Sequence, residues 1–275
     1  MWLFGQSPWL PRDQYQPITD AEDIEFPTAD GLTLRGSIIA SRLPYCSGVV
    51  LFSHELNSDR WSVSPWVDSL SQQGYDIITF DQRNHGTSDS DRRYQSTPWI
   101  SQIDVDDIRA AMRFIEQCYQ NVPVTIMGVN KGGLTALGAA ADCDLPIQSI
   151  VIDCDLCTPQ WQPDAPGSRK SFSPISWIGR MKNALINRWR RKILGVWCGC
   201  RFVNLKRLAS RVRQPVLWIG NDRPEILRRF DDAEHLEPHY RVLRFLEINR
   251  PLSQPSDIPH SMADADLKII DAIRT

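Results

Sequence analysis

The sequence lacks several features that would direct it to a specialised class of protein. No apolar run reaches the ~18 residues needed to span a bilayer. The opening segment MWLFGQSPWLP has no basic region, so we expect no secretory signal. No internal repeat is present, which argues against a repeat architecture. Positive charge is not in excess, because 31 Lys and Arg stand against 33 Asp and Glu; the net charge of −2 argues against a nucleic-acid binder.

Cysteine is sparse and odd in number. Seven cysteines in a chain large enough to form a core predict free thiols in a reducing compartment, and we expect a cytoplasmic location. Zinc sites favour two C-x-x-C pairs, whereas this chain has one such pair and one C-x-C pair. We therefore expect buried thiols, with no metal and no cofactor; the cysteines concerned are Cys154, Cys157, Cys198 and Cys200.

What the chain does contain is an alternation of short buried strands and amphipathic helices. Its 275 residues, 42% hydrophobic and 23% charged, fit one large α/β domain or one domain with an insertion. Strands that are apolar on both faces, alternating with helices, predict a mostly parallel sheet covered on both sides. We expect strands within 23–41 (two, joined by a turn), 47–54, 76–81, 122–129, 147–155 and 214–221, and helices within 66–75, 105–119, 131–141 and 264–273.

This alternation breaks between residues 158 and 210. Four prolines precede a helical stretch whose large apolar residues recur at helical spacing among Arg and Lys: Trp177, Met181, Leu185 and Trp189. We predict an N-terminal arm over 1–23, a core over 24–157 and 211–275, and a helical cap over 158–210. The basic helix could contact an anionic membrane surface. We favour a lid helix whose apolar stripe packs on the sheet.

Three motifs together resemble the α/β-hydrolase superfamily, and its serine aminopeptidase and acyl-ester hydrolase-like branch in particular. SHELNSDRW follows a strand where that fold has an oxyanion loop. GYDIITFDQRNHGTSD is similar to the family's D-x-R-x-H-G-x-S turn, and GVNKGG to its nucleophile elbow G-x-S-x-G-G. The resemblance implies an α/β-hydrolase fold with a central, mostly parallel sheet, flanking helices and a cap.

The resemblance also assigns candidate site residues. Asn130 stands where the family has its nucleophilic serine, Asp222 is the candidate acid, and His260 is the candidate base. The oxyanion-hole region falls on His54, Glu55, Leu56 and Lys131, and Cys154 follows a strand end where it could face the pocket. The tip of such an elbow sits in a strained positive-φ conformation, which Asn tolerates, so we expect Asn130 to keep the turn shape without strain relief elsewhere.

Simple structural roles compete with these assignments. Glu55 replaces a usual glycine and would disfavour an oxyanion, unless it pairs with Arg60 or points to solvent. We expect His85 to bind backbone within its turn and Asp81 to organise a loop through Arg83 or backbone amides.

Two functions remain open. An Asn carboxamide is a poor nucleophile with no proton for a base to remove, which predicts a pseudo-hydrolase that binds a small acyl or ester-like ligand, or a protein partner. The alternative is an active ester or amide hydrolase in which Asn130 is converted to aspartate, or in which Asp222 and His260 direct a water. The sequence leaves the oligomeric state open.

Overall fold

The computed structural model describes residues 15–141, 145–154, 189, 192–220 and 240–244.

A hairpin forms one edge of the sheet. Within it β1 (Glu22–Pro27) pairs antiparallel with β2 (Thr33–Ile39). Gly31 in the connecting turn has a φ of 87°, a conformation that glycine adopts at low cost. The two strands predicted within 23–41, and the turn between them, are confirmed.

The described strands form one eight-stranded sheet in the order β1-β2-β4-β3-β5-β6-β7-β8. β2 runs antiparallel to β4, and every later pairing is parallel. The remaining strands are β3 (Gly48–Ser53), β4 (Tyr75–Phe80), β5 (Val124–Val129), β6 (Ile147–Asp153), β7 (Val216–Gly220) and β8 (Tyr240–Arg244). The predicted strands and the mostly parallel sheet are confirmed, whereas β8 was not foreseen.

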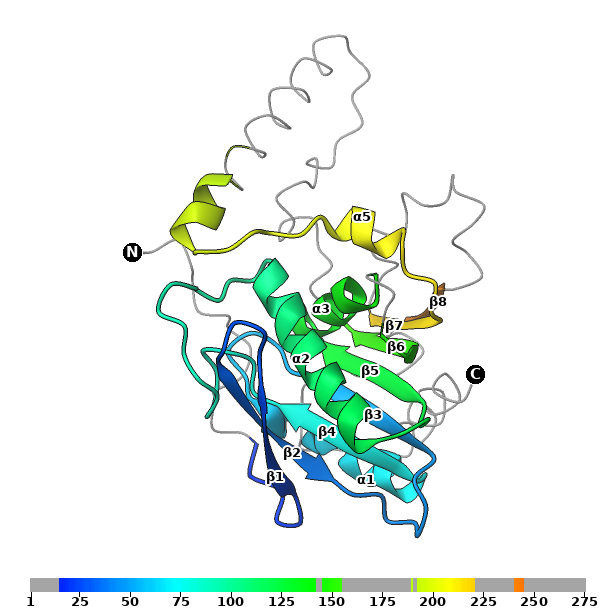
Figure 1. Ribbon diagram of the computed structural model, residues 1–275. Coiled ribbons are helices and arrows are strands. Elements are labelled where there is room, and N and C mark those ends of the chain that lie inside the picture. The colour runs from blue at the N-terminus through cyan, green and yellow to red at the C-terminus, as the bar shows by residue number, and fades with distance from the viewer. Residues whose placement is uncertain (1–14, 142–144, 155–188, 190–191, 221–239, 245–275) are drawn as a thin grey trace.

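Helices cover both faces of this sheet (Figure 1). On one face, α2 (Gln102–Cys118) and α3 (Lys131–Ala140) bury residues such as Leu51, Ile126 and Ile152. On the other face, the short helix η1 (Arg60–Val63) and α1 (Ser64–Gln72) pack on alternate strand positions such as Val50. Each strand therefore supplies two apolar cores, which explains its unbroken apolar sequence. In the described part of the chain, no helix is long and apolar enough to cross a membrane.

Part of the predicted cap is described, and it joins the start of α2. The backbone N–H of Gln102 donates to Arg201 O at 2.8 Å, and Val203 N donates to Ile100 O at 2.9 Å. Residues 192–197 are helical, and α5 (Leu205–Ala209) follows. Trp189 is 60% exposed, so the expectation that the apolar stripe packs on the sheet is wrong at this residue. The rest of the stripe and the predicted helix within 264–273 lie outside the described residues.

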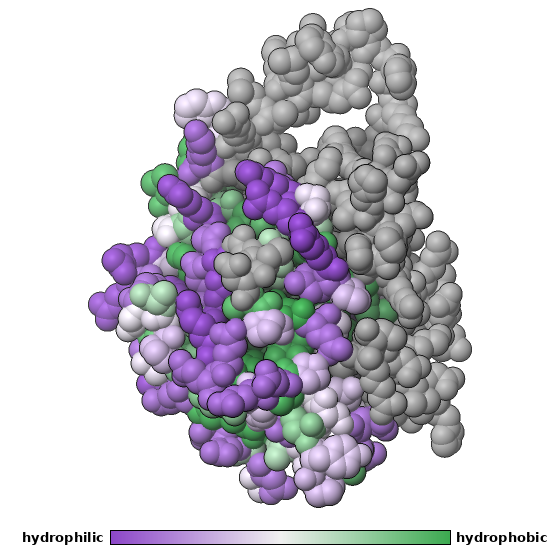
Figure 2. Space-filling view, turned by 45° about the vertical axis from the view of Figure 1, so that its right-hand side comes forward, coloured by the Kyte–Doolittle hydropathy of each residue, from purple (hydrophilic) through white to green (hydrophobic). Residues whose placement is uncertain are grey.

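The described surface is mainly hydrophilic on the face drawn in Figure 2, with apolar residues scattered between polar ones. Helix α2 illustrates this arrangement: its apolar residues Val105, Ile108, Met112 and Ile115 are buried, while Arg113 and Glu116 are exposed. The predicted helical face of this segment is confirmed.

Candidate functional site

The turn between β5 and α3 has the backbone of a nucleophile elbow. Asn130 at its tip has a φ of 48° and a ψ of −111°. Its N–H donates to Asp153 O on β6 at 2.7 Å, which ties the tip to the sheet. This ψ lies outside the left-handed well that Asn tolerates, so the turn is strained, at a cost of about 1–3 kcal/mol. The strained positive φ expected at the elbow tip is confirmed.

Close packing at the elbow explains how the strain persists. A Cβ placed on Gly132 would lie 2.1 Å from Ser53 O, and one placed on Gly128 would lie 2.4 Å from Gly133 N. Helix α3 thus starts directly against the end of β3, and only glycine fits at these two positions. The surrounding backbone holds Asn130 in place whether or not its side chain takes part in chemistry.

The side chain of Asn130 is engaged by the oxyanion loop. Its Nδ2 donates to Glu55 Oε2 at 2.8 Å, and both residues are half-buried. Burial raises the pKa of Glu55, and the hydrogen bond from Asn130 partly opposes that rise. The expectation that Glu55 pairs with Arg60 or points to solvent is wrong, because Arg60 binds Asp81 and Asp23 instead.

Both histidines near the elbow are buried and already occupied. His54 Nδ1 lies 2.7 Å from Glu55 O, and its Nε2 accepts from Gln82 N at 3.1 Å, an arrangement that fits one neutral tautomer. Burial, aided by the neighbouring His85, lowers the pKa of His54 to about 3. His85 Nδ1 lies 3.0 Å from Arg83 O, which confirms its expected backbone contact. Burial also lowers the pKa of His85. Both rings are therefore engaged in structural contacts.

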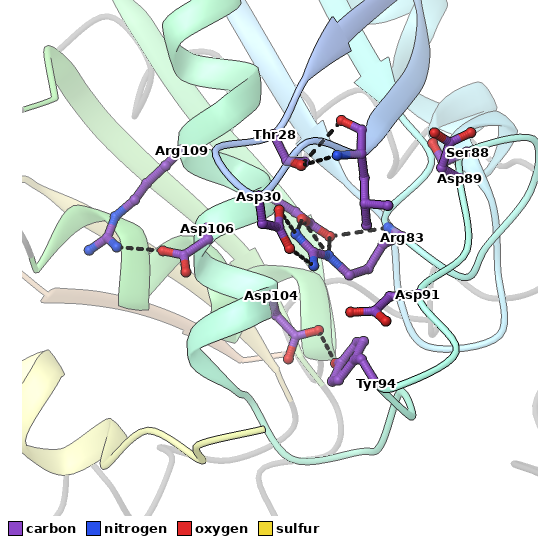
Figure 3. A network of polar contacts seen from close by, with 12 residues as sticks. Thr28, Asp30, Arg83, Ser88, Asp89, Asp91, Tyr94, Asp104, Asp106 and Arg109 are labelled. Atoms are coloured by element: carbon purple, nitrogen blue, oxygen red, sulfur yellow. Dashed lines mark hydrogen bonds and ion pairs between the residues drawn. The ribbon is translucent and has the colours of Figure 1, made fainter. Parts of the chain in front are cut away.

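Behind the elbow, Lys131 makes a buried ion pair. Its Nζ lies 2.8 Å from Asp104 Oδ1, and the two side chains are 3% and 2% exposed. Asp104 also accepts from the Tyr94 hydroxyl at 2.6 Å and closes a capping box with Ser101 at the start of α2 (Figure 3). The sequence placed Lys131 in the oxyanion-hole region but gave no indication of Asp104 or Tyr94. No spacing in the sequence connects these residues, which come from separate elements.

The turn after β4 is organised by two separate carboxylate–arginine sets. Asp81 accepts from the backbone N–H of Arg60 at 2.8 Å and of Thr87 at 2.9 Å, so its loop-organising role is confirmed. Arg83 does not pair with Asp81, contrary to one expectation; it lies between Asp107 and Asp30, at 2.7 Å from each (Figure 3). Burial raises the pKa of Asp107 to about 6, and the Arg83 contacts oppose this rise.

The other predicted site residues are placed as follows. Leu56 is half-buried in the turn after Glu55. Cys154 is 2% exposed and belongs to the core that α2 and α3 cover. Asp222 and His260 lie outside the described residues, as does Cys157.

Within the described ranges, no group of three or more His, Cys, Asp or Glu side chains could hold a metal ion.

The arm brings one further residue toward the site that the sequence did not indicate. Tyr15 is half-buried, and burial raises the pKa of its phenol, with the charges of Glu55 and Asp59 adding to the rise. Ile18 packs against the core beneath α1. The end of the arm therefore packs on the domain, as predicted for 1–23.

Comparison with known proteins agrees with this geometry. The family model "Serine aminopeptidase, S33" matches residues 46–214. The thiohydrolase aneE of Aspergillus aculeatus is 32% identical over 138 residues, which are 49% of this chain and 41% of that protein; the chain thus spans less than half of the relative's length. An esterase of Pyrococcus furiosus matches with a TM-score of 0.62 and 16% identity, over 98% of this chain and 94% of that one. An esterase of Exiguobacterium antarcticum matches with a TM-score of 0.57 and 13% identity, over 91% and 99%. These two structures share the fold, and the sequence model covers well over half of the chain: the protein belongs to the serine aminopeptidase S33 family of α/β-hydrolases.

Proposed function

We propose that this protein is a hydrolase-fold protein with impaired acyl transfer, which acts by binding a small acyl or ester-like ligand, or a protein partner, over the elbow. One observation carries the proposal. The residue at the elbow tip is Asn130, and its amide is hydrogen-bonded to the Glu55 carboxylate at 2.8 Å. The backbone of a catalytic elbow is thus present, while its side chain is committed to a neighbour.

The first reason for impaired transfer is the nucleophile. Covalent acyl transfer needs a hydroxyl or thiol whose proton passes to a base as the new bond forms. The carboxamide of Asn130 offers neither, and its nitrogen already donates to Glu55. His54 and His85, the described histidines near the elbow, each make a hydrogen bond to the backbone.

The second reason is electrostatic. Acyl transfer develops negative charge on the substrate oxygen, and hydrolases stabilise it with hydrogen-bond donors that are fixed in advance. Here the loop after β3 presents a half-buried carboxylate beside the elbow tip instead. An ionised Glu55 would raise the energy of such an oxyanion. A neutral ester or amide would still be accommodated, because it carries no charge.

Turnover of aryl esters and aryl thioesters tests the proposal with four proteins: native, Asn130→Ser, Glu55→Gly and the double variant. Thioesters belong in the panel because the Aspergillus relative is named a thiohydrolase. We expect no turnover from the native protein or from Glu55→Gly, which has no nucleophile. We expect the double variant to exceed Asn130→Ser by about 100-fold, a typical effect of one oxyanion interaction.

The control is Asn130→Ala, which removes the Glu55 contact without adding a hydroxyl. Turnover by the native protein that Asn130→Ala abolishes would contradict the proposal. If every variant is inactive, the binding half of the proposal is decided by a thermal-shift screen with a non-hydrolysable acyl amide. A rise in melting temperature for the native protein supports it, and no shift with any acyl ligand refutes it.

One contact favours the alternative, an active hydrolase in which residue 130 has become Asp. Glu55 holds a carboxyl of raised pKa 2.8 Å from the amide nitrogen, where it could donate a proton to departing ammonia as water attacks the amide carbon. The product would place two carboxylates side by side, which opposes this conversion. Intact mass of the elbow peptide decides the matter, since conversion adds about one dalton.

A further inference from the structure

Charge is strongly segregated along this chain. Between residues 165 and 221 there are 13 Lys and Arg and not one Asp or Glu. Because the whole chain carries a formal net charge of −2, the remaining residues carry −15. The near-neutral total therefore hides a basic segment, and a local positive charge of this size attracts anionic partners.

Within this segment, one helical face is apolar and exposed. Four side chains on residues 189–197 face solvent: Trp189 is 60% exposed, Ile193 64%, Val196 86% and Trp197 74%. At roughly 100° per residue, these positions fall within an arc of roughly 100° on one side of the helix.

The opposite side of the same helix faces the protein. Cys198 is 1% exposed, and Leu194 and Gly195 are at least partly buried. Cys198 O accepts from Gln95 N at 3.0 Å, which fixes the helix to the loop before α2. Figure 1 shows this helix, in yellow-green, beyond the N-terminal end of α2 and away from the sheet. The apolar face is thus held outward by its anchorage.

Cations flank this apolar face. Lys192 is exposed, with its Nζ 5.8 Å from the centre of the Trp189 ring. Arg201 and Arg93 are exposed on the adjoining segments, and a Cβ on Gly199 would meet Arg93 O, so the two segments are in contact. Arg93 also pairs with Asp91 at 3.3 Å, so part of its charge is offset. Exposed Trp and aliphatic side chains bordered by Lys and Arg form the pattern of a helix that lies at a lipid–water interface.

We propose that the outward face formed by Trp189, Ile193, Val196 and Trp197 docks on an anionic lipid surface. Trp189 and Trp197 enter the interfacial region, the aliphatic side chains enter the acyl boundary, and the flanking cations contact lipid phosphates. Charge complementarity selects this occupant. A second copy docking through the same face would oppose two basic segments, and single-stranded nucleic acid would stack on the tryptophans without using Ile193 or Val196.

Vesicle co-sedimentation of the full chain tests this proposal. The probes are vesicles of phosphatidylcholine alone and of phosphatidylcholine mixed with phosphatidylserine. We expect binding to the mixed vesicles only, and release by about 0.5 M NaCl. The double variant V196S/W197S should lower the partition coefficient by about tenfold or more. Lys192→Gln should lower it about fivefold, the effect of one cation near an anionic surface.

Tyr45→Ser is the matched control, since Tyr45 is 61% exposed on the loop between β2 and β3. It should bind like the native protein, and circular dichroism confirms that each variant is folded. Absence of binding to the mixed vesicles, or equal binding by V196S/W197S, overturns the proposal. Two other outcomes would also overturn the proposal. A dimer in light scattering that V196S/W197S dissociates would assign this face to a second copy of the chain. Binding of a single-stranded oligonucleotide without vesicle binding would assign it to nucleic acid.

Discussion

Replacing Lys131 by Met breaks the buried ion pair behind the elbow and tests how this region is held together. Lys131 Nζ lies 2.8 Å from Asp104 Oδ1, and the side chains are 3% and 2% exposed. Met has a similar length and no charge, so the variant fills the space while leaving Asp104 as a buried carboxylate. Tyr94 and Ser101 still donate to that carboxylate, which softens the loss.

The expected magnitude follows from burial. Removing one partner of a buried pair destabilises a protein by about 3–5 kcal/mol, because the remaining charge has lost its counter-charge. In a domain of this size the change corresponds to a fall of roughly 10 °C in melting temperature. Burial alone raises the pKa of Asp104, but the charge and hydrogen bond of Lys131 outweigh that effect, so the net pKa is lowered. Without Lys131, burial wins, and the deficit should shrink as the pH falls and Asp104 is protonated.

Urea unfolding, followed by circular dichroism at neutral and at acidic pH, measures this effect. The matched control is Arg109→Met, whose partner Asp106 lies on the same helix in an ion pair 22% and 40% exposed. That pair should contribute no more than about 0.5 kcal/mol. Asp104→Asn in combination with Lys131→Met should recover part of the loss. A free energy of unfolding for Lys131→Met within about 1 kcal/mol of the native value would contradict this prediction. A loss of stability that does not depend on pH would contradict it as well.

Two further predictions concern the contact between Glu55 and Asn130. Because burial raises the pKa of Glu55, the folded state holds this proton more tightly than the unfolded state, and stability falls as the pH rises from the ordinary Glu range through the raised pKa. Glu55→Gln should therefore gain stability over the native protein as the pH rises through that range, whereas Glu22→Gln, at an exposed position, should not. A difference in urea midpoint between Glu55→Gln and the native protein that does not change with pH would contradict this. Asn130→Asp should place two carboxylates where the amide now lies 2.8 Å from Glu55, so that they share one proton. The melting temperature of Asn130→Asp should fall more steeply than that of the native protein as the pH rises. Adding Glu55→Gln should suppress this dependence in the double variant. Equal slopes of melting temperature against pH would show that the two groups do not interact.

Most of the described fold could be predicted from the sequence because the information is local. Buried strands such as 48–53 are apolar on both faces, and the turn of 128–133 needs glycines wherever its backbone passes close to another segment. Each of these constraints lies in a run of neighbouring residues, so it can be predicted without coordinates.

The contacts of the site were not local, and they were predicted less well. One alternative interpretation paired Glu55 with Arg60, five residues away, but it binds Asn130, which is 75 residues away. Lys131 was assigned to the oxyanion-hole region, whereas its side chain pairs with Asp104 on another helix. Such pairs depend on which strand ends are adjacent in the sheet. Strand β8 was missed for a related reason, since YRVLR carries charges and does not read as a buried strand.

The strained elbow has a consequence for how proteins of this fold change over time. The conformation of Asn130 is imposed by glycines and by a bond to the β6 backbone, and the identity of its side chain plays little part. Some serine codons differ from an asparagine codon by a single base, and asparagine accepts positive φ at least as readily as serine. A single-base substitution at such a tip can therefore remove a reaction without unfolding the protein. The scaffold then survives selection for as long as anything still binds to it, which makes this architecture prone to produce non-catalytic descendants.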